Sequence, residues 1–112
     1  MSNCIAQITS VSGIVIEISE SALGHALEGH PEVTLDMVRR TCEAPSVVIK
    51  SKKNNTVCLF YRVLGTHSEE EMFFCVVIES HRPGRGRMLT AYETNFIKSG
   101  DILFDNRQKG DL

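Results

Sequence analysis

The sequence predicts an α+β domain in which two N-terminal helices pack on one face of a four-stranded antiparallel sheet. Two observations lead to this fold class. Apolar residues recur at helical spacing before Pro45, and β-rich runs with strand-like alternation follow that proline. The segments between these runs are short and rich in turn-forming residues, which favours hairpins and therefore antiparallel pairing.

The first helix is expected over residues 20–29, because small and apolar side chains recur there at helical spacing. Ser19 or Ser21 can cap its N-terminus by accepting a hydrogen bond from a free backbone N–H group. Gly29 and Pro31 are typical of a helix end and stop the pattern.

A second helix is expected over residues 35–44, with Thr34 as its N-cap and apolar side chains on one face. Pro45 ends this helix. Before both helices, residues 8–19 are rich in isoleucine and valine around a glycine. This segment predicts one or two short N-terminal strands.

Four strands are expected after Pro45, because each segment is rich in β-branched and aromatic residues and is bounded by turn-like residues. These strands cover residues 45–51, 55–65, 71–80 and 86–93. One further apolar patch extends from Ile102 to Phe104. We expect residues 1–112 to form one domain with a core from about residue 11 to about residue 104, followed by a frayed tail.

Composition indicates a folded cytoplasmic protein. A hydrophobic content of 42% and a charged content of 23% are ordinary for soluble domains. No apolar run approaches the roughly 20 residues that a membrane span needs, and no secretory signal is recognisable. The four cysteines form no CxxC motif, which fits a reduced compartment. A zinc site of Cys42, Cys58, Cys75 and a histidine is disfavoured by irregular spacing, so neither a metal nor a cofactor is expected.

Charge is distributed unevenly, although the net charge is only -2. Residues 1–36 contain five acidic residues and no lysine or arginine, whereas residues 37–62 contain six basic residues and one acidic residue. Local fields decide which partner a surface attracts. We expect one basic face, away from Glu69 to Glu71, formed by Lys50, Lys52, Lys53, Arg62, Arg85 and Arg87.

Several short motifs occur in a fixed order along the chain. His-Pro-Glu at 30–32 lies between the helices, Val-Val-Ile-Glu-Ser lies at 76–80, and Met-Leu-Thr-Ala-Tyr-Glu lies at 88–93. In this order the chain resembles phage-encoded domains of the barnase–EndoU–colicin–RelE nuclease superfamily. The resemblance implies a metal-independent endoribonuclease in which RNA lies across the sheet. It also marks His30 and Thr90 as active-site-like positions.

The chemistry of RNA cleavage without a metal suggests further candidates. Attack by the 2′-hydroxyl needs a base, an acid and cations that stabilise the phosphorane. Histidine suits proton transfer because its unperturbed pKa is about 6.5, and arginine matches the geometry of phosphate. The catalytic candidates are therefore His30, His25 and Thr90. The candidates for binding RNA are Arg85, Arg87, Lys50, Arg62, Tyr61 and Tyr92.

His30 is favoured over His25 as the functional imidazole. Gly29 and Pro31 place His30 at a helix end, where its ring can face solvent and the edge of the sheet. His25 lies one turn inside the helix, where the stripe of small residues is expected to pack it down. Either histidine can alternatively be structural, as a packing residue or as a cap at the helix junction.

A second hypothesis is a catalytically inactive protein-binding module on the same scaffold, such as a phage or mobile-element inhibitor or an antitoxin-like partner. The acidic N-terminal third favours this hypothesis, because small ribonucleases are usually basic. The paired histidines and the arginine-rich turn favour the enzyme. A third hypothesis is a structural subunit that dimerises through a sheet edge. The expected partners are RNA and a cognate antitoxin, immunity or host target protein, with no membrane.

Overall fold

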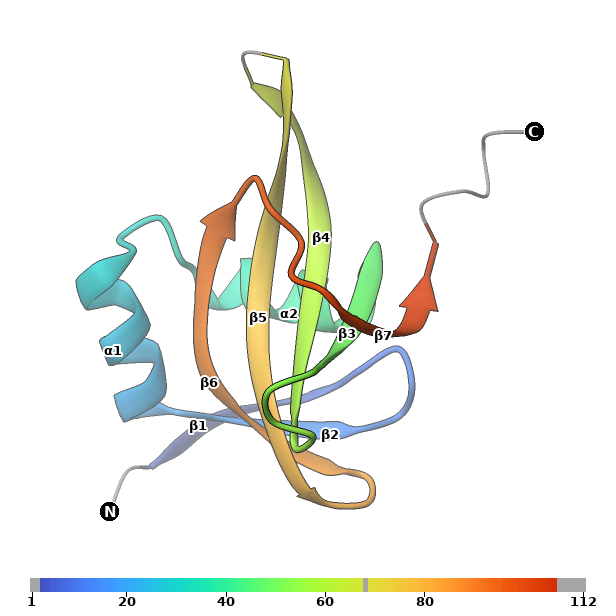
Figure 1. Cartoon of the computed structure of the whole chain (residues 1–112). Coiled ribbons are helices and arrows are strands. Elements are labelled where there is room, and N and C mark those ends of the chain that lie inside the picture. The colour runs from blue at the N-terminus through green and yellow to red at the C-terminus, as the bar shows by residue number, and fades with distance from the viewer. Residues whose placement is uncertain (1–2, 68, 107–112) are drawn as a thin grey trace.

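The computed structural model describes residues 3–67 and 69–106, which form a seven-stranded mixed sheet with two helices (Figure 1). Neighbouring strands are antiparallel except for β2 and β6, which are parallel. In spatial order the strands are β1 (Cys4–Thr9), β2 (Val15–Ser19), β6 (Arg85–Thr94), β5 (Glu70–Arg82), β4 (Val57–His67), β3 (Val47–Ser51) and β7 (Gly100–Asp105).

The predicted four-stranded antiparallel sheet is wrong, although its four strands are present as β3 to β6. The β1–β2 hairpin extends the sheet beyond β6, because Val15 to Glu17 pair in parallel with Arg85 to Arg87. At the other edge, β7 pairs with β3. Both additions join segments that lie far apart in the sequence, and local periodicity does not specify such long-range pairing.

The two helices lie where the sequence predicts them, α1 at Glu20–Gly29 and α2 at Leu35–Glu43. The Ser19 hydroxyl accepts a hydrogen bond from the Ala22 N–H group at 3.1 Å, and the Thr34 hydroxyl accepts one from Met37 at 3.1 Å. These caps satisfy backbone donors that an α-helix leaves free at its N-terminus. Both helices contribute buried residues to one apolar core of the seven-stranded sheet.

The sheet therefore has a helix face and a second face, and each buries its own apolar core. The helix-face core includes residues of the N-terminal hairpin, both helices and every central strand: Ile8, Ile16, Ile18, Ala26, Val33, Val38, Cys42, Val48, Phe60, Phe74, Val76, Ile78, Met88 and Ala91. The second core consists of Val47, Ile49, Leu59, Tyr61, Phe73 and Cys75. Strand alternation explains this division, because successive side chains point to opposite faces.

The second face is covered by the crossover, residues 95–99, which connects β6 to β7 across the sheet (Figure 1). Ile97 packs on the second core, and the Lys98 N–H group donates a hydrogen bond to the Tyr61 hydroxyl at 3.2 Å. We call this face the crossover face. It is the side of the sheet from which both helices are absent.

Gly100 allows the crossover to return to β3. A Cβ atom at this position would overlap the Lys50 carbonyl oxygen and the Ile49 side chain, so β7 can start here only with a glycine. The chain is predicted to fray after about residue 104; Asp105 still belongs to β7, and the rest of the predicted tail beyond residue 106 lies outside the described residues. Within the described part of the chain, no helix is long and apolar enough to cross a membrane.

Candidate functional site

The crossover face carries a groove of about 550 Å³ between the crossover, the β3–β4 turn and the middle of β6. We call it the lysine groove. The residues that line it are Ser51, Lys52, Lys53, Val57, Leu59, Val77, Thr90, Tyr92, Phe96, Lys98 and Ser99. Its floor is apolar strand surface, whereas its rim carries three lysines and an aromatic ring.

The rim residues are accessible to a ligand. Lys52, Lys53 and Lys98 are exposed, and none of the three forms an ion pair with a carboxylate of the described residues. The Phe96 ring is 62% exposed. Ammonium groups without a carboxylate partner can bind phosphate groups. The exposed aromatic ring beside them offers a face on which a base can stack.

A bulge in β6 directs Thr90 and Tyr92 into this groove. Met88 pairs with Ile78 and Thr90 pairs with Val77, so Leu89 is an extra residue without a partner on β5. Alternation then places Thr90 and Tyr92 on the crossover face, whereas Ala91 joins the helix-face core.

His30 approaches the same strand from the end of α1. Its backbone N–H group donates to the Ala26 carbonyl at 2.8 Å, and its ring lies 5.6 Å from the Tyr92 ring between centroids. The His30 Nδ1 atom is 3.6 Å from Glu32 Oε2, which also accepts a hydrogen bond from the Glu93 N–H group at 3.4 Å. The structure thus places His30 against Tyr92, and Tyr92 lines the lysine groove together with Thr90; all three are predicted site residues.

A buried polar cluster supports Tyr92 from below. The Cys75 thiol lies beside the hydroxyls of Tyr61 and Tyr92, which lower its pKa against the larger effect of burial. Burial raises the pKa of Cys75 to about 11 and that of Tyr61 to about 12, and burial also raises the pKa of Tyr92. All three groups are therefore protonated at neutral pH. Tyr61 is fully buried, so the stacking role predicted for it is excluded and its contribution is support.

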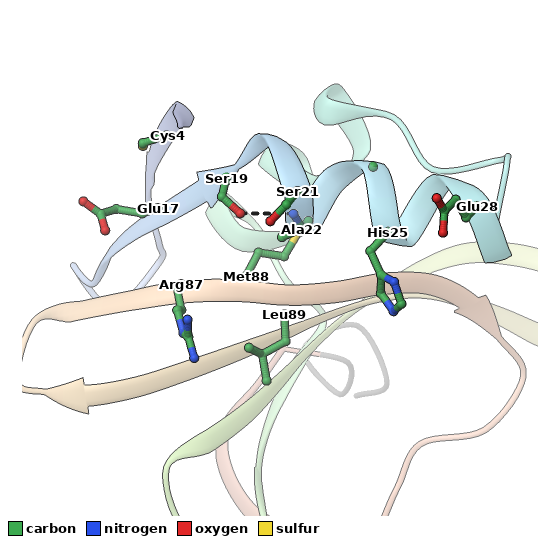
Figure 2. A pocket seen from close by; sticks show the side chains of 11 residues that line it. Cys4, Glu17, Ser19, Ser21, Ala22, His25, Glu28, Arg87, Met88 and Leu89 are labelled. Carbon is green, nitrogen blue, oxygen red and sulfur yellow. Dashed lines mark hydrogen bonds between the residues drawn. The ribbon is translucent and has the colours of Figure 1, made fainter. Parts of the chain in front are cut away.

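His25 is placed differently from the prediction. It is exposed rather than packed down, and it lines a second cavity between α1 and β6 (Figure 2). Ala26 is the buried residue of this turn. Because His25 lies next to Ala26 in the helix, it is rotated by about 100° away from the buried direction.

The predicted cations do not form one basic face. Lys50 and Arg62 point to the helix face, since their neighbours in the register, Cys58 and Phe74, pack in or against the helix-face core. Arg85 lies in the β5–β6 turn region at the start of β6. The predicted shared face is wrong, because side chains at alternate positions of a strand point to opposite faces of the sheet. Closeness in the sequence therefore did not place these cations on one face.

Arg87 is already engaged by a carboxylate. Its Nε and Nη2 atoms donate to Glu79 Oε1 at 2.9 and 2.6 Å, and His81 Nε2 lies 3.3 Å from the same oxygen. The hydrogen bond from Arg87 is the main cause that lowers the pKa of the Glu79 carboxyl group. Arg87 is therefore less available to phosphate than the three rim lysines.

Phe96 and Lys98 line the lysine groove, although neither was among the predicted site residues. The available signal was the apolar Ile97 between them, which indicates a packed segment rather than a tail. The disfavoured zinc site is excluded by position, because Cys75 lies in the second core while Cys42 and Cys58 pack on the helix face. The described residues contain no group of three side chains that could hold a metal ion.

Comparisons with models of protein families, with curated proteins and with solved structures gave no significant match to this chain. Function is therefore inferred from the lysine groove and from the residues around it.

Proposed function

We propose that this chain is a metal-independent endoribonuclease that binds a single-stranded RNA segment in the lysine groove. The observation that carries the proposal is that the His30 ring contacts Tyr92, which lines with Thr90 a groove whose three lysines have no described carboxylate partner. The proposal agrees with the activity that the superfamily resemblance implies.

Binding follows from the charges and the aromatic ring of the rim. Lys52, Lys53 and Lys98 neutralise successive phosphates and release their counterions. Phe96 provides a face on which one base stacks, a contact that is worth about 1–3 kcal/mol and tolerates any base. The apolar floor excludes water from the part of the RNA next to Tyr92.

Cleavage follows from the groups beside Tyr92. His30 accepts the proton of the 2′-hydroxyl, whose oxygen attacks the adjacent phosphorus, and Glu32 stabilises the resulting imidazolium. Thr90 donates a hydrogen bond to a phosphate oxygen, Tyr92 holds the His30 ring in place, and the lysines balance the charge of the phosphorane. A rim lysine protonates the departing 5′-oxygen. The products are a 2′,3′-cyclic phosphate and a 5′-hydroxyl end.

Cleavage is tested by incubating the purified chain with total RNA and with tRNA in EDTA. Wild type is expected to cleave, and His30→Ala is expected to lower the rate by about 10²–10⁴-fold, because a proton-transfer group is lost. His25→Ala is the matched control, because His25 is an exposed imidazole on the same helix and lines another cavity. A parent without ribonuclease activity, or an unimpaired His30→Ala variant, would refute the enzyme.

Binding is tested separately with a noncleavable 2′-deoxy oligonucleotide. A variant in which Lys52, Lys53 and Lys98 are all changed to glutamine should bind more weakly, and its log Kd should depend less steeply on log salt, by about 2 units for three lost contacts. A Lys50→Gln, Arg62→Gln double variant controls for net charge on the helix face. Equal slopes in wild type and the triple variant would exclude the lysine groove.

A catalytically inactive protein-binding module is the second candidate. It is favoured by the separation of the two histidines that were predicted to share proton transfer. His25 lines the second cavity, so His30 is the one imidazole beside Tyr92 among the described residues. Tight salt-dependent binding of the oligonucleotide without any cleavage of RNA would favour an RNA-binding relative of the enzyme. Absence of both binding and cleavage would favour the protein-binding module.

A further inference from the structure

The outer edge of β6 is unpaired over part of its length. β5 pairs with β6 along one side, but on the other side β2 pairs only with Arg85 to Arg87. From Met88 to Tyr92, no strand of the described residues occupies this edge. At its far end the Glu93 N–H group is taken by the Glu32 carboxylate. The open edge therefore spans roughly 14 Å, at about 3.4 Å per residue.

A cavity of about 960 Å³ lies between α1 and the start of this open edge, where Met88 and Leu89 line it. Figure 2 shows β6 below the helix, with the His25 side chain pointing from α1 toward the strand and with Leu89 on the strand itself. We call this cavity the edge groove. One wall is helix surface and the other contains strand backbone, which an extended chain can pair with.

Gly24 lies in the middle of α1 on the wall of the edge groove. A glycine inside a helix costs about 0.5–1 kcal/mol relative to alanine. Packing within the chain does not require it, because a Cβ atom at this position would meet nothing within 4 Å. The missing side chain leaves room for an occupant to lie close to the helix backbone.

The charges of the edge groove are opposite to those of the lysine groove. Glu17 and Glu28 line it, and the one arginine among its described lining residues, Arg87, is held by Glu79. Such a lining disfavours nucleic acid and other polyanions, and it favours a segment that carries lysine or arginine.

We propose that the edge groove binds an extended basic peptide segment of another protein, which adds as a strand to the open edge of β6. Backbone hydrogen bonds to the edge supply affinity, and alternate side chains facing Glu17 and Glu28 supply specificity. The proposal goes beyond the ribonuclease and does not depend on it, because the edge groove and the lysine groove are lined by different residues.

The test uses two fluorescent octapeptides, one alternating valine with lysine and one alternating valine with glutamate, added to the full chain. The lysine peptide is expected to bind at least tenfold more tightly than the glutamate peptide. Amide chemical shifts should change at residues 24–28 and 88–92, and the outward amides of β6 should exchange more slowly with solvent. Absence of binding, equal binding of the two peptides, or shifts confined to Lys52, Lys53 and Lys98 with none at residues 24–28 would refute the proposal.

Substitutions at Gly24 distinguish an effect on peptide binding in the edge groove from an effect on folding. Gly24→Trp should fill the edge groove and weaken binding of the lysine peptide by at least tenfold, whereas Gly24→Ala should raise the melting temperature and retain binding. Unchanged binding in a folded Gly24→Trp variant would overturn the proposal. The wild-type shift map decides the question even where the tryptophan variant does not fold.

Discussion

The two faces of the sheet bury their apolar side chains by different means. On the helix face, two capped helices and an N-terminal hairpin enclose a core of fourteen buried residues among those described. On the crossover face, a five-residue connection covers six. The candidate RNA site lies on the thinly covered face. Because only the crossover covers this face, its side chains remain accessible. Hydrogen bonds between polar groups, rather than apolar packing, must then fix the positions of these side chains.

The composition of the two cores reflects this difference. The helix-face core is almost entirely apolar, whereas the crossover face contains the polar groups of Tyr61, Cys75 and Tyr92. The crossover is held on this face by the hydrogen bond from the Lys98 N–H group to the Tyr61 hydroxyl. Buried hydroxyl and thiol groups need partners, which restricts their geometry more than apolar contacts do. Such restriction is useful beneath a site that must hold Tyr92 against His30.

The largest expected difference between the faces is in the free energy of unfolding that is lost when a buried side chain is truncated and leaves a cavity. Ile78→Ala on the helix face and Ile49→Ala on the crossover face remove the same atoms from buried positions, 1% and 3% exposed. Each substitution should lower the free energy of unfolding by about 2–5 kcal/mol. We expect Ile78→Ala to lie at the upper end, because the crossover can collapse onto a cavity more easily than two helices can. Urea unfolding measures both, and equal losses would mean that the faces are equally rigid.

A smaller effect is expected where the crossover meets the sheet. Gly100→Ala inserts a methyl group against the Lys50 carbonyl and Ile49, so it should lower the free energy of unfolding by about 1–3 kcal/mol. Hydrogen exchange should accelerate in β7 and leave α1 and α2 unchanged. Ser99→Ala, at the neighbouring exposed position, should have little effect on either measurement. Faster exchange throughout the helices would show that the two faces unfold as one unit.

The smallest effect is confined to alkaline pH. Burial raises the pKa of Cys75 on the crossover face to about 11 and of Cys42 on the helix face to about 12, from 9.0 for both groups. A raised folded-state pKa stabilises the fold fully below pH 9 and progressively less as pH rises to the folded value. The free energy of unfolding should therefore decline above about pH 9.

Single cysteine variants show how much of this decline in the free energy of unfolding comes from each face. Cys42→Ala should flatten the alkaline slope up to about pH 12, and Cys75→Ala should flatten it only up to about pH 11. The free energy of unfolding of wild type and of each variant, measured from pH 7 to 12, distinguishes the two contributions. A wild-type slope of zero above pH 9 would contradict the burial of both thiols.

The sequence predicted what local chemistry determines. Caps at Ser19 and Thr34 place both helices, and alternation places the four central strands. The parallel pairing of β2 with β6 and the addition of β7 were missed, because each depends on residues far away in the chain. His25 was assigned to the buried stripe, although one position separates it from Ala26 and rotates it out.

The candidate site was predictable in part for the same reason. His30, Thr90 and Tyr92 belong to short motifs, so sequence located them. Phe96 and Lys98 reach the lysine groove only because the crossover spans the sheet, and the sequence predicts no such path. The function of these residues depends on a topology that local patterns do not encode.

The crossover also constrains the order of events during synthesis. Residues 95–105 must leave the ribosome before the crossover face can close and before β7 can pair with β3, which was made some fifty residues earlier. The fourteen buried residues of the helix-face core all precede the crossover, and Phe104 of β7 packs against them afterwards. Nascent chains that stop short of the crossover can therefore fold one core while the rim of the lysine groove is still incomplete. The lysine groove is thus the last part of the described sheet to be completed.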